Sequence, residues 1–472
     1  MKKTTYIALF VLLFTLGVSV QAQRKVVLDL EGTVRLAVDS SFTAQKLQSD
    51  YNVARFNYLS WQASRKPQVL LESTSELSFD QRHLYTQGGI NVTQVFEPLG
   101  GTFYGSTQLG YMRTFGKSHQ FMTTPVALGY RQESLFFNPL KWDKSIETLK
   151  LTRAEKELFY GMEAVSEEAV GKFFSLALAQ DQLQMAEEYL AACDTIYAIA
   201  ERRYKISSIS KADLSILELE KTNAQMTLAN ARIDQQRAMQ ELASFLRMGP
   251  DIEIELIIPE VVQDLQVNAA EAIQHARDNN PRYIESRQAI TEALRDAEKA
   301  RIEKNLNLGL DLSMSLNQVA STFPGAYMNL VPQDVAAITL SLPLVDWGKR
   351  RNVYQSALNN VESAQRAEQE AARDTELDVA LTVADFNERK AIVETARQAF
   401  IIADEAYAQT MRQFISAQAS TYALTWALSC WQTARKNQIA SLKNYWIAYY
   451  HLQYLTLYDF QRQQVITSHG NI

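Results

Sequence analysis

The sequence predicts a mixed fold, an all-α coiled-coil tunnel together with a transmembrane β-barrel, and three observations predict it. The first is a helical stretch from Lys349 to Phe414 that contains neither Pro nor Gly. The second is a set of segments of about ten residues in which apolar and polar residues alternate, as in barrel strands. The third is an internal duplication of helix–strand–strand–helix order. At 1.5 Å per residue, a helix of about 65 residues is about 100 Å long, which exceeds the needs of a compact domain.

The N-terminus has the pattern of a secretory signal peptide. Lys2 and Lys3 precede an apolar run from Tyr6 to Val18, and Ala22 offers a small residue for cleavage. Residues 1–22 are therefore expected to be removed from an exported protein. The apolar run is too short for a membrane-spanning helix, and no Cys follows the cleavage site to carry a lipid. Any membrane residence is expected to use strands.

Composition and motifs argue against two classes of function, nucleic-acid binding and catalysis. The 47 basic and 53 acidic residues are nearly balanced and form no basic patch, so nucleic acid is not an expected partner. The five histidines are scattered without metal-ligand spacing, and no nucleophile elbow or phosphate-binding glycine loop is present. We therefore expect no enzyme, no cofactor and no metal. Cys193 and Cys430 lie in predicted helices, where they are either packing residues or partners in a disulfide.

The first repeat is expected to span residues 23–266. A helix from about 31 to 66 ends before Pro67, and the periodicity then changes to the alternation of strands. Strands are expected over about 68–136. A helical hairpin over about 142–248 follows, and Gly249-Pro250 ends it at the start of a connector, 249–266.

The second repeat, residues 267–472, follows the same order. A helix over about 269–304 precedes strands over about 306–345 and a helical hairpin over about 348–457. Along 308–317, the Leu and Met side chains fall on one face of the strand and Gly, Asp, Ser and Asn on the other. The hairpin turns of the two repeats correspond at a spacing of about 210 residues, as in the pairs Tyr204/Phe414, Ser210/Ser420 and Leu214/Leu424.

Helix lengths predict how the rods are arranged. Two short helices of about 36–38 residues placed end to end match one long helix to within about 10–15%. A cylinder can therefore be built in which each long rod lies beside a stacked pair. The two or three strand hairpins are too few to close a barrel, which needs about eight strands, so several copies are expected to share one. An exported β-sandwich beside a coiled coil is the alternative, and it leaves the matched lengths unexplained.

Four segments resemble a known family. Leu342-Pro-Leu-Val-Asp-Trp-Gly-Lys-Arg-Arg351 is similar to a strand-to-helix joint, Asn138-Pro-Leu-Lys-Trp-Asp-Lys144 is its first-half counterpart, and the hairpin turns lie at 204–214 and 414–424. Together with the duplicated order, they resemble the TolC family of outer-membrane efflux ducts over essentially the whole mature chain. The resemblance implies a homotrimer in the outer membrane, a shared barrel of normally twelve strands and an α-helical tunnel in the periplasm. It also implies docking to a periplasmic adaptor and an inner-membrane pump of the RND or ABC type.

The sequence departs from the family at the hairpin tips. Ser207 and Ala417 stand where the family usually has Gly. Asp213 matches an Asp of the network that closes the tunnel tip, but the Tyr and Arg partners of that network correspond to Phe414 and Ala419.

The aspartates that ring the entrance in the family correspond to Ala423 and Trp426. The candidate gate is therefore Asp213 with an apolar constriction at Phe414 and Trp426. The alternatives are that Asp213 is a helix N-terminal acid favoured by the macrodipole and that the two aromatic residues are ordinary hairpin packing.

A further departure from the family is a hairpin at 88–115. Three placements are open for it: it adds strands, forms an extracellular flap or folds into the lumen.

The function expected from these observations is a passive export duct without chemistry. The residues expected to contact the adaptor are those at the tips of the two helical hairpins: Ser207, Ser208, Ile209, Ala417, Gln418 and Ala419. The outer duct of a type I protein-secretion system has the same architecture and is the closest alternative. A purely structural or adaptor coiled coil is a third class, and it leaves the amphipathic strands unexplained.

Overall fold

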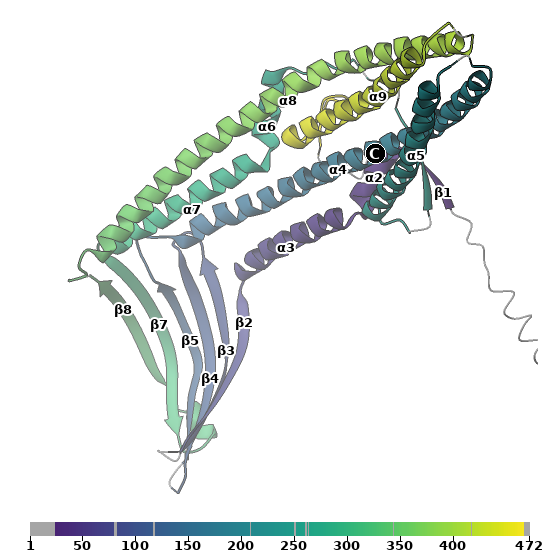
Figure 1. The fold of residues 1–472 in the computed structure, drawn as a ribbon. Coiled ribbons are helices and arrows are strands. Elements are labelled where there is room, and N and C mark those ends of the chain that lie inside the picture. Colours follow the sequence, from purple (N-terminus) through teal and green to yellow (C-terminus); the bar gives the residue numbers. More distant parts are fainter. Residues whose placement is uncertain are drawn as a thin grey trace, which may run out of the picture. The chain divides into compact units, whose positions relative to one another are not determined.

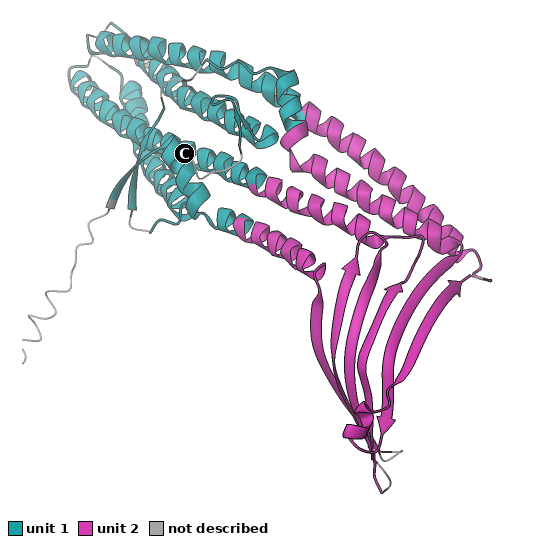
Figure 2. Ribbon diagram, turned by 180° about the vertical axis from the view of Figure 1, so that it is seen from behind, with its two compact units in different colours: residues 1–47, 159–276, 378–472 teal, residues 48–158, 277–377 magenta. Residues whose placement is uncertain are grey.

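A computed structural model describes residues 24–466 except 80–82, 117–118, 208, 250–251, 260–261, 263, 343 and 417. The predicted signal peptide, residues 1–22, lies outside the described residues. The chain forms two units, coloured separately in Figure 2. Unit 1 comprises residues 1–47, 159–276 and 378–472, and unit 2 comprises residues 48–158 and 277–377.

Long helices make up most of the chain. They are α2 (Leu30–Ser40), α3 (Phe42–Ser64), α4 (Pro139–Lys205), α5 (Lys211–Phe245), α6 (Ala269–Asn279), α7 (Pro281–Lys304), α8 (Lys349–Ile415) and α9 (Thr421–Thr456). The predicted uninterrupted helix is present as α8, and α4 has the same length of 67 residues. The repeated order of helix, strands and helical hairpin is confirmed, with more strands in the first repeat than in the second.

Two helices that the sequence predicts as single rods are each divided in two. The division falls at Ser41, whose hydroxyl oxygen accepts a hydrogen bond from the Ala44 backbone N–H at 3.1 Å. In the second repeat it falls at Asn280, whose side chain accepts from the Arg282 N–H at 3.1 Å, with Pro281 in the first turn. Both residues cap a new helix, which apolar periodicity alone does not reveal.

The two helical hairpins begin their second helices in the same way. Ser210 and Ser420 have nearly identical backbone angles, with φ −77° and ψ near 160°, and each side chain accepts a hydrogen bond from the third residue of its helix. These N-caps stand 210 residues apart and give the duplication a structural basis.

Unit 2 contains a six-stranded antiparallel sheet in the order β2-β3-β4-β5-β7-β8 (Figure 1). Its strands are β2 (Gln68–Ser78), β3 (His83–Phe96), β4 (Gly101–Thr114), β5 (His119–Gln132), β7 (Asn307–Ala320) and β8 (Val331–Ser341), with a 3-10 turn η1 (Pro324–Tyr327) before β8. The hairpin whose role the sequence left open supplies β3 and β4, so it adds strands to the sheet. The pairing of β5 with β7 shifts between Thr123 and Val126, where Pro125 sits at the irregularity.

The helical part of unit 2 packs through small side chains. Ala297 and Ala300 of α7 contact Ala357 of α8, with Tyr354 and Val361 packed against them. Small residues let two helices approach closely, which agrees with the predicted coiled-coil-like seam.

Unit 1 contains two small sheets in addition to its helices. Strand β1 (Arg24–Asp29) pairs in parallel with β6 (Ile252–Ile257), so the predicted connector, residues 249–266, contains a strand. Strands β9 (Tyr458–Asp459) and β10 (Gln464–Val465) form a short antiparallel pair.

The helices of unit 1 enclose an apolar core with few charges. Phe173, Phe174 and Phe386 are fully buried there. An ion pair between Arg435 and Asp181 joins α9 to α4 at 2.7 Å. Both cysteines are free thiols, Cys193 buried and Cys430 exposed, so the alternative of a disulfide is wrong for this structure.

Glu163 of α4 is a buried carboxyl group beside a polar cavity of about 580 Å³ in unit 1. Asp459 also lines the cavity and accepts a hydrogen bond from the Tyr449 hydroxyl at 2.8 Å. Burial, followed by the negative charge of Asp459, raises the pKa of Glu163 to about 8. The folded state therefore holds a proton on Glu163 at pH values where the unfolded chain has lost it.

Among the described residues, no helix is both long enough and apolar enough to cross a membrane.

Glu163→Gln is expected to stabilise the protein increasingly as the pH rises. The folded pKa lies near 8 and the unfolded value near 4.5, so the wild type loses stability as the pH rises between these values. At pH 8 the variant should exceed the wild type by at least about 1 kcal/mol, and at pH 4 the two should be equal. Thermal unfolding followed by circular dichroism at both pH values measures this. Glu168→Gln, on an exposed side chain of the same helix, is the control, and equal effects of both variants would contradict the assignment.

Candidate functional site

One face of the six-stranded sheet is apolar and exposed. The strand register places these aliphatic side chains on it: Val69, Leu71, Leu77, Leu84, Ile90, Val92, Leu109, Val126, Leu128, Leu308, Leu310, Leu312, Met314, Leu316, Ile338 and Leu340. Leu71 and Ile338, on the two edge strands, are 74% and 71% exposed. An apolar face that extends over six strands is far larger than the patches on soluble monomers.

Charged residues are nearly absent from this face. Among the described residues, β2, β3, β5 and β7 place no Asp, Glu, Lys or Arg on it. Arg113 lies near the end of β4, and Asp334 lies on the edge strand β8.

Aromatic side chains flank the aliphatic ones at both ends of the face. Near one end, Phe103 packs against Phe96 and Tyr130 with ring centres 5.5 and 4.8 Å apart. Near the other, Phe121 lies 5.1 Å from Tyr111. Phe103 and Tyr111 are separated by about 27 Å along β4 at 3.4 Å per residue. An aliphatic band between two aromatic girdles is the arrangement of strands that cross a membrane.

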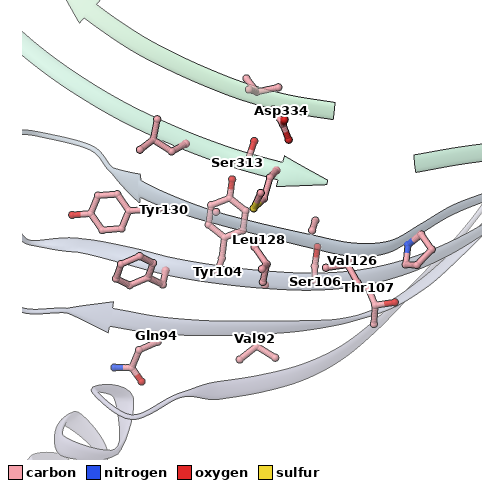
Figure 3. A pocket seen from close by; sticks show the side chains of 18 of the residues that line it. Val92, Gln94, Tyr104, Ser106, Thr107, Val126, Leu128, Tyr130, Ser313 and Asp334 are labelled. Atoms are coloured by element: carbon pink, nitrogen blue, oxygen red, sulfur yellow. The ribbon is translucent and has the colours of Figure 1, made fainter. Parts of the chain in front are cut away.

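The apolar face is hollowed over β3, β4, β5, β7 and β8 (Figure 3). The hollow has a volume of about 980 Å³, and apolar residues such as Val92, Leu128 and Met314 line it. It opens where Gly105 lies between Val92 and Leu128 in the register and contributes no side chain. This composition suits an apolar occupant and offers no cluster of catalytic groups.

The opposite face of the sheet is polar and internally hydrogen-bonded. The Tyr104 hydroxyl donates to Asp311 at 2.9 Å, and the Arg131 guanidinium donates to the same carboxylate at 2.8 Å. Tyr104 lies across Gly129, where a Cβ atom would collide with its ring. One carboxylate thereby connects β4, β5 and β7.

Amide and hydroxyl side chains extend this polar face toward both edges. Gln87 donates to Gln108 at 2.6 Å, linking β3 to β4. Asn317 accepts from Thr124 at 2.8 Å and donates to Gln333 at 2.7 Å, linking β5, β7 and β8. The two faces thus differ as the alternation in the sequence predicts.

The predicted docking residues lie at the turns of the helical hairpins in unit 1, as far as they are described. Ser207 and Gln418 are exposed, and Ser207 has a left-handed backbone with φ +54°, a conformation that Gly adopts more readily than Ser. Ile209 and Ala419 are half-buried against the apolar cluster described next. Ser208 and Ala417 lie outside the described residues.

The three candidate gate residues have different environments. Asp213 forms a capping box, accepting hydrogen bonds from the Ser210 hydroxyl and backbone N–H at 2.7 and 3.3 Å. Phe414 is 4% exposed in a cluster that includes Leu217 and Leu424. Trp426 is 63% exposed. These surroundings agree with the alternatives of helix capping for Asp213 and hairpin packing for Phe414, and the gate role stays a prediction.

Arg203 is a tip residue outside the predicted docking and gate residues. Its guanidinium donates to the backbone carbonyls of Phe414 and Ile415 at 3.3 and 3.4 Å and lies 5.6 Å from the Phe414 ring centre. A cation is favourable at the C-terminal end of a helix, so Arg203 of α4 caps α8. The sequence feature that points to this contact is the basic last turn of α4, which contains Arg202, Arg203 and Lys205.

No group of three or more His, Cys, Asp or Glu within the described ranges is arranged to hold a metal ion.

Residues 272–456 match the family model described as outer membrane efflux protein. No curated protein matches the sequence. A membrane protein from Pseudomonas aeruginosa has a similar crystal structure, with a TM-score of 0.67, 16% identity and coverage of 90% of each chain. The outer membrane protein VceC from Vibrio cholerae has a TM-score of 0.65 at 13% sequence identity. The match covers 91% of this chain and 95% of the VceC chain. The MtrE outer membrane channel from Neisseria gonorrhoeae, in its open state, has a TM-score of 0.66 at 13% sequence identity. The match covers 93% of this chain and 90% of the MtrE chain.

The fold is therefore that of the TolC-like outer-membrane channels. The resemblance to the TolC family of outer-membrane efflux proteins is confirmed, with the sequence match confined to residues 272–456 and the fold shared over about nine-tenths of the chain. That family is defined by efflux and not by a catalytic activity.

Gly129→Ala is expected to destabilise the sheet. The added Cβ would collide with the Tyr104 ring and lie 2.7 Å from the Leu312 carbonyl oxygen, which breaks the contact that positions Tyr104 toward Asp311. The expected loss is about 1–3 kcal/mol, measured as thermal unfolding in detergent. Gly110→Ala on the same face is the matched control, because its nearest contact is 3.5 Å. Equal stability of the two variants would contradict the packing.

Proposed function

We propose that this chain is the outer-membrane duct of a tripartite efflux system and conducts substrates passively to the exterior. The observation that carries the proposal is the exposed apolar face of the six-stranded sheet, bounded by aromatic residues. Burying such a face in lipid stabilises the sheet by about 25 cal/mol per Å² of apolar area removed from water. The polar face then lines a water-filled path. The hollow at Gly105 is of a kind that a lipid acyl chain fills.

The sheet cannot serve as a duct in a single copy. Both edge strands, β2 and β8, have unpaired backbone groups, which lipid does not tolerate. We propose that three copies close one barrel, the assembly that the resemblance to the TolC family implies. The same resemblance supports a cleaved signal peptide and location in the outer membrane, with the helical part in the periplasm.

The helical hairpins are proposed to form the tunnel and its docking end. Ser207 and Gln418 are exposed there, and a periplasmic adaptor with an inner-membrane pump of the RND or ABC type is the partner expected from the family. The Arg203 cap holds the turn after α8 in place, and rearrangement of this region would open the path. The outer component of a type I protein-secretion system remains the second candidate, since the cargo is selected by the pump.

Replacing Leu310 and Leu312 together with Asp should prevent insertion. Two charges would enter the lipid-facing surface of β7, where Leu312 lies opposite Tyr130, and a charge on the lipid-facing surface destabilises a barrel. The matched control replaces Ser313 and Ser315 with Asp on the polar face of the same strand. Quantifying trimers in purified outer membranes tests the orientation, and normal yield of the Leu variant would refute it.

Deleting residues 415–420 should abolish export and leave trimers intact. The deletion removes the turn and the Ser420 cap at the proposed docking end without touching the sheet. Export of a fluorescent substrate from cells and trimer yield in membranes are measured together. Arg366→Ala, on an exposed helix surface, should retain export. Wild-type export by the deletion variant would remove this turn from docking.

A further inference from the structure

The six-stranded sheet has two more strands than the twelve-stranded barrel of a trimer accommodates. Twelve strands shared by three copies are four per copy, whereas β2, β3, β4, β5, β7 and β8 are paired here in one sheet. The surplus is the hairpin β3–β4. Its place in the barrel wall, or outside the wall, decides the width of the duct.

The β3–β4 hairpin is an integral part of the sheet. Every residue of β2 has a partner in β3, from Gln68 opposite Thr93 to Ser78 opposite His83. On the other side, β4 pairs with β5 from Thr102 opposite Arg131 to Arg113 opposite His119. A flap outside the wall would leave β2 and β5 without these neighbours.

Both faces of the sheet continue through the hairpin. Ile90 and Val92 of β3 lie on the apolar face in line with Leu128 and Met314 of β5 and β7. On the polar face, Gln87 of β3 hydrogen-bonds to Gln108 of β4. The hairpin thus has the same lipid-facing and water-facing surfaces as the strands beside it, and a hairpin folded into an aqueous lumen would expose the apolar ones to water.

The edges of the sheet are matched for closure with a second copy. Strands β2 and β8 are each 11 residues long, and the residues of both are exposed along nearly their whole length. The sheet is antiparallel throughout and has an even number of strands, so β2 and β8 run in opposite directions. Copies related by rotation can therefore place β8 of one beside β2 of the next and preserve the antiparallel pattern around the ring.

We propose that three copies of this chain close an eighteen-stranded barrel through β8–β2 seams, with β3 and β4 in its wall. The proposal rests on the proposed function for the trimer and the membrane. Barrel diameter grows about linearly with strand number, so at equal tilt the barrel is about 1.5 times as wide as one of twelve strands. Barrels of about this strand number leave an open aqueous channel, which suits bulkier cargo than a narrower barrel passes.

Cysteine accessibility in intact outer membranes tests whether β3 lies in the wall. Single cysteines replace Val92 and Thr93, which are on the two faces of β3, in a background with Cys193→Ala and Cys430→Ser. A water-soluble maleimide should label the Thr93 position about tenfold more than the Val92 position, because a thiol in lipid is shielded from the reagent and from water. After the protein is unfolded in denaturant, the same maleimide should label both positions equally, because both thiols are then in water.

Positions on β7 at the same level of the sheet are the matched control. Met314 aligns with Val92, and Ser313 aligns with Thr93, through the paired strands between them. Alternation on both strands supports the proposal. Alternation on β7 with water-soluble labelling of both β3 positions overturns the wider barrel and leaves the duct intact. Absence of alternation on β7 rejects the membrane-embedded sheet itself, and the proposed function with it.

A double-cysteine scan of β2 against β8 tests the seam between copies. At least one pair should give cross-linked dimers and trimers on denaturing gels, and light scattering of the detergent-solubilised protein should give three copies. If no pair across the two strands cross-links, or if the copy number is not three, the eighteen-stranded barrel is wrong.

Discussion

The constraint on which this structure depends is that backbone hydrogen bonds in an apolar environment must be satisfied by other backbone groups. An extended sheet with one exposed apolar face can meet lipid only if its edges are paired. Each internal strand of the unit 2 sheet is paired on both sides, and the two open edge strands, β2 and β8, are equal in length. The proposed closure by further copies rests on this requirement more directly than on any individual side chain.

The two faces of the sheet are stabilised by different interactions. In the proposed membrane setting, the apolar face contributes through burial in lipid, and its aromatic ends suit the boundary between lipid and water. The polar face is organised by hydrogen bonds, with Asp311 as acceptor for Tyr104 and Arg131. Glycine at position 129 is needed because the Tyr104 ring occupies the space above it. Specific packing on one face thus accompanies non-specific burial on the other.

The turns of the helical hairpins are fixed mainly by hydrogen bonds at the helix ends beside them. Ser210 and Ser420 start α5 and α9 with the same cap geometry, although Asp213 completes a capping box only in the first hairpin. In the second, the turn after α8 is held by Arg203 from α4. The two repeats therefore share the cap and differ in the contacts around it.

Much of the fold was determined by the sequence itself, because periodicity reports which side of an element is apolar. The long rod α8, the alternation along β7, the duplication and the resemblance to outer-membrane efflux ducts are all properties of local pattern. The breaks at Ser41 and Asn280 escaped prediction because a single cap hydrogen bond divides a helix without changing its apolar stripe.

The place of the β3–β4 hairpin became visible in the three-dimensional structure, since the pairing partners of a strand are set by contacts remote in sequence. The tertiary structure also decided that Cys193 and Cys430 are apart as free thiols, that Phe414 is buried while Trp426 is exposed, and that Arg203 reaches the end of another helix. Each of these depends on which elements pack together, a property that no local spacing encodes.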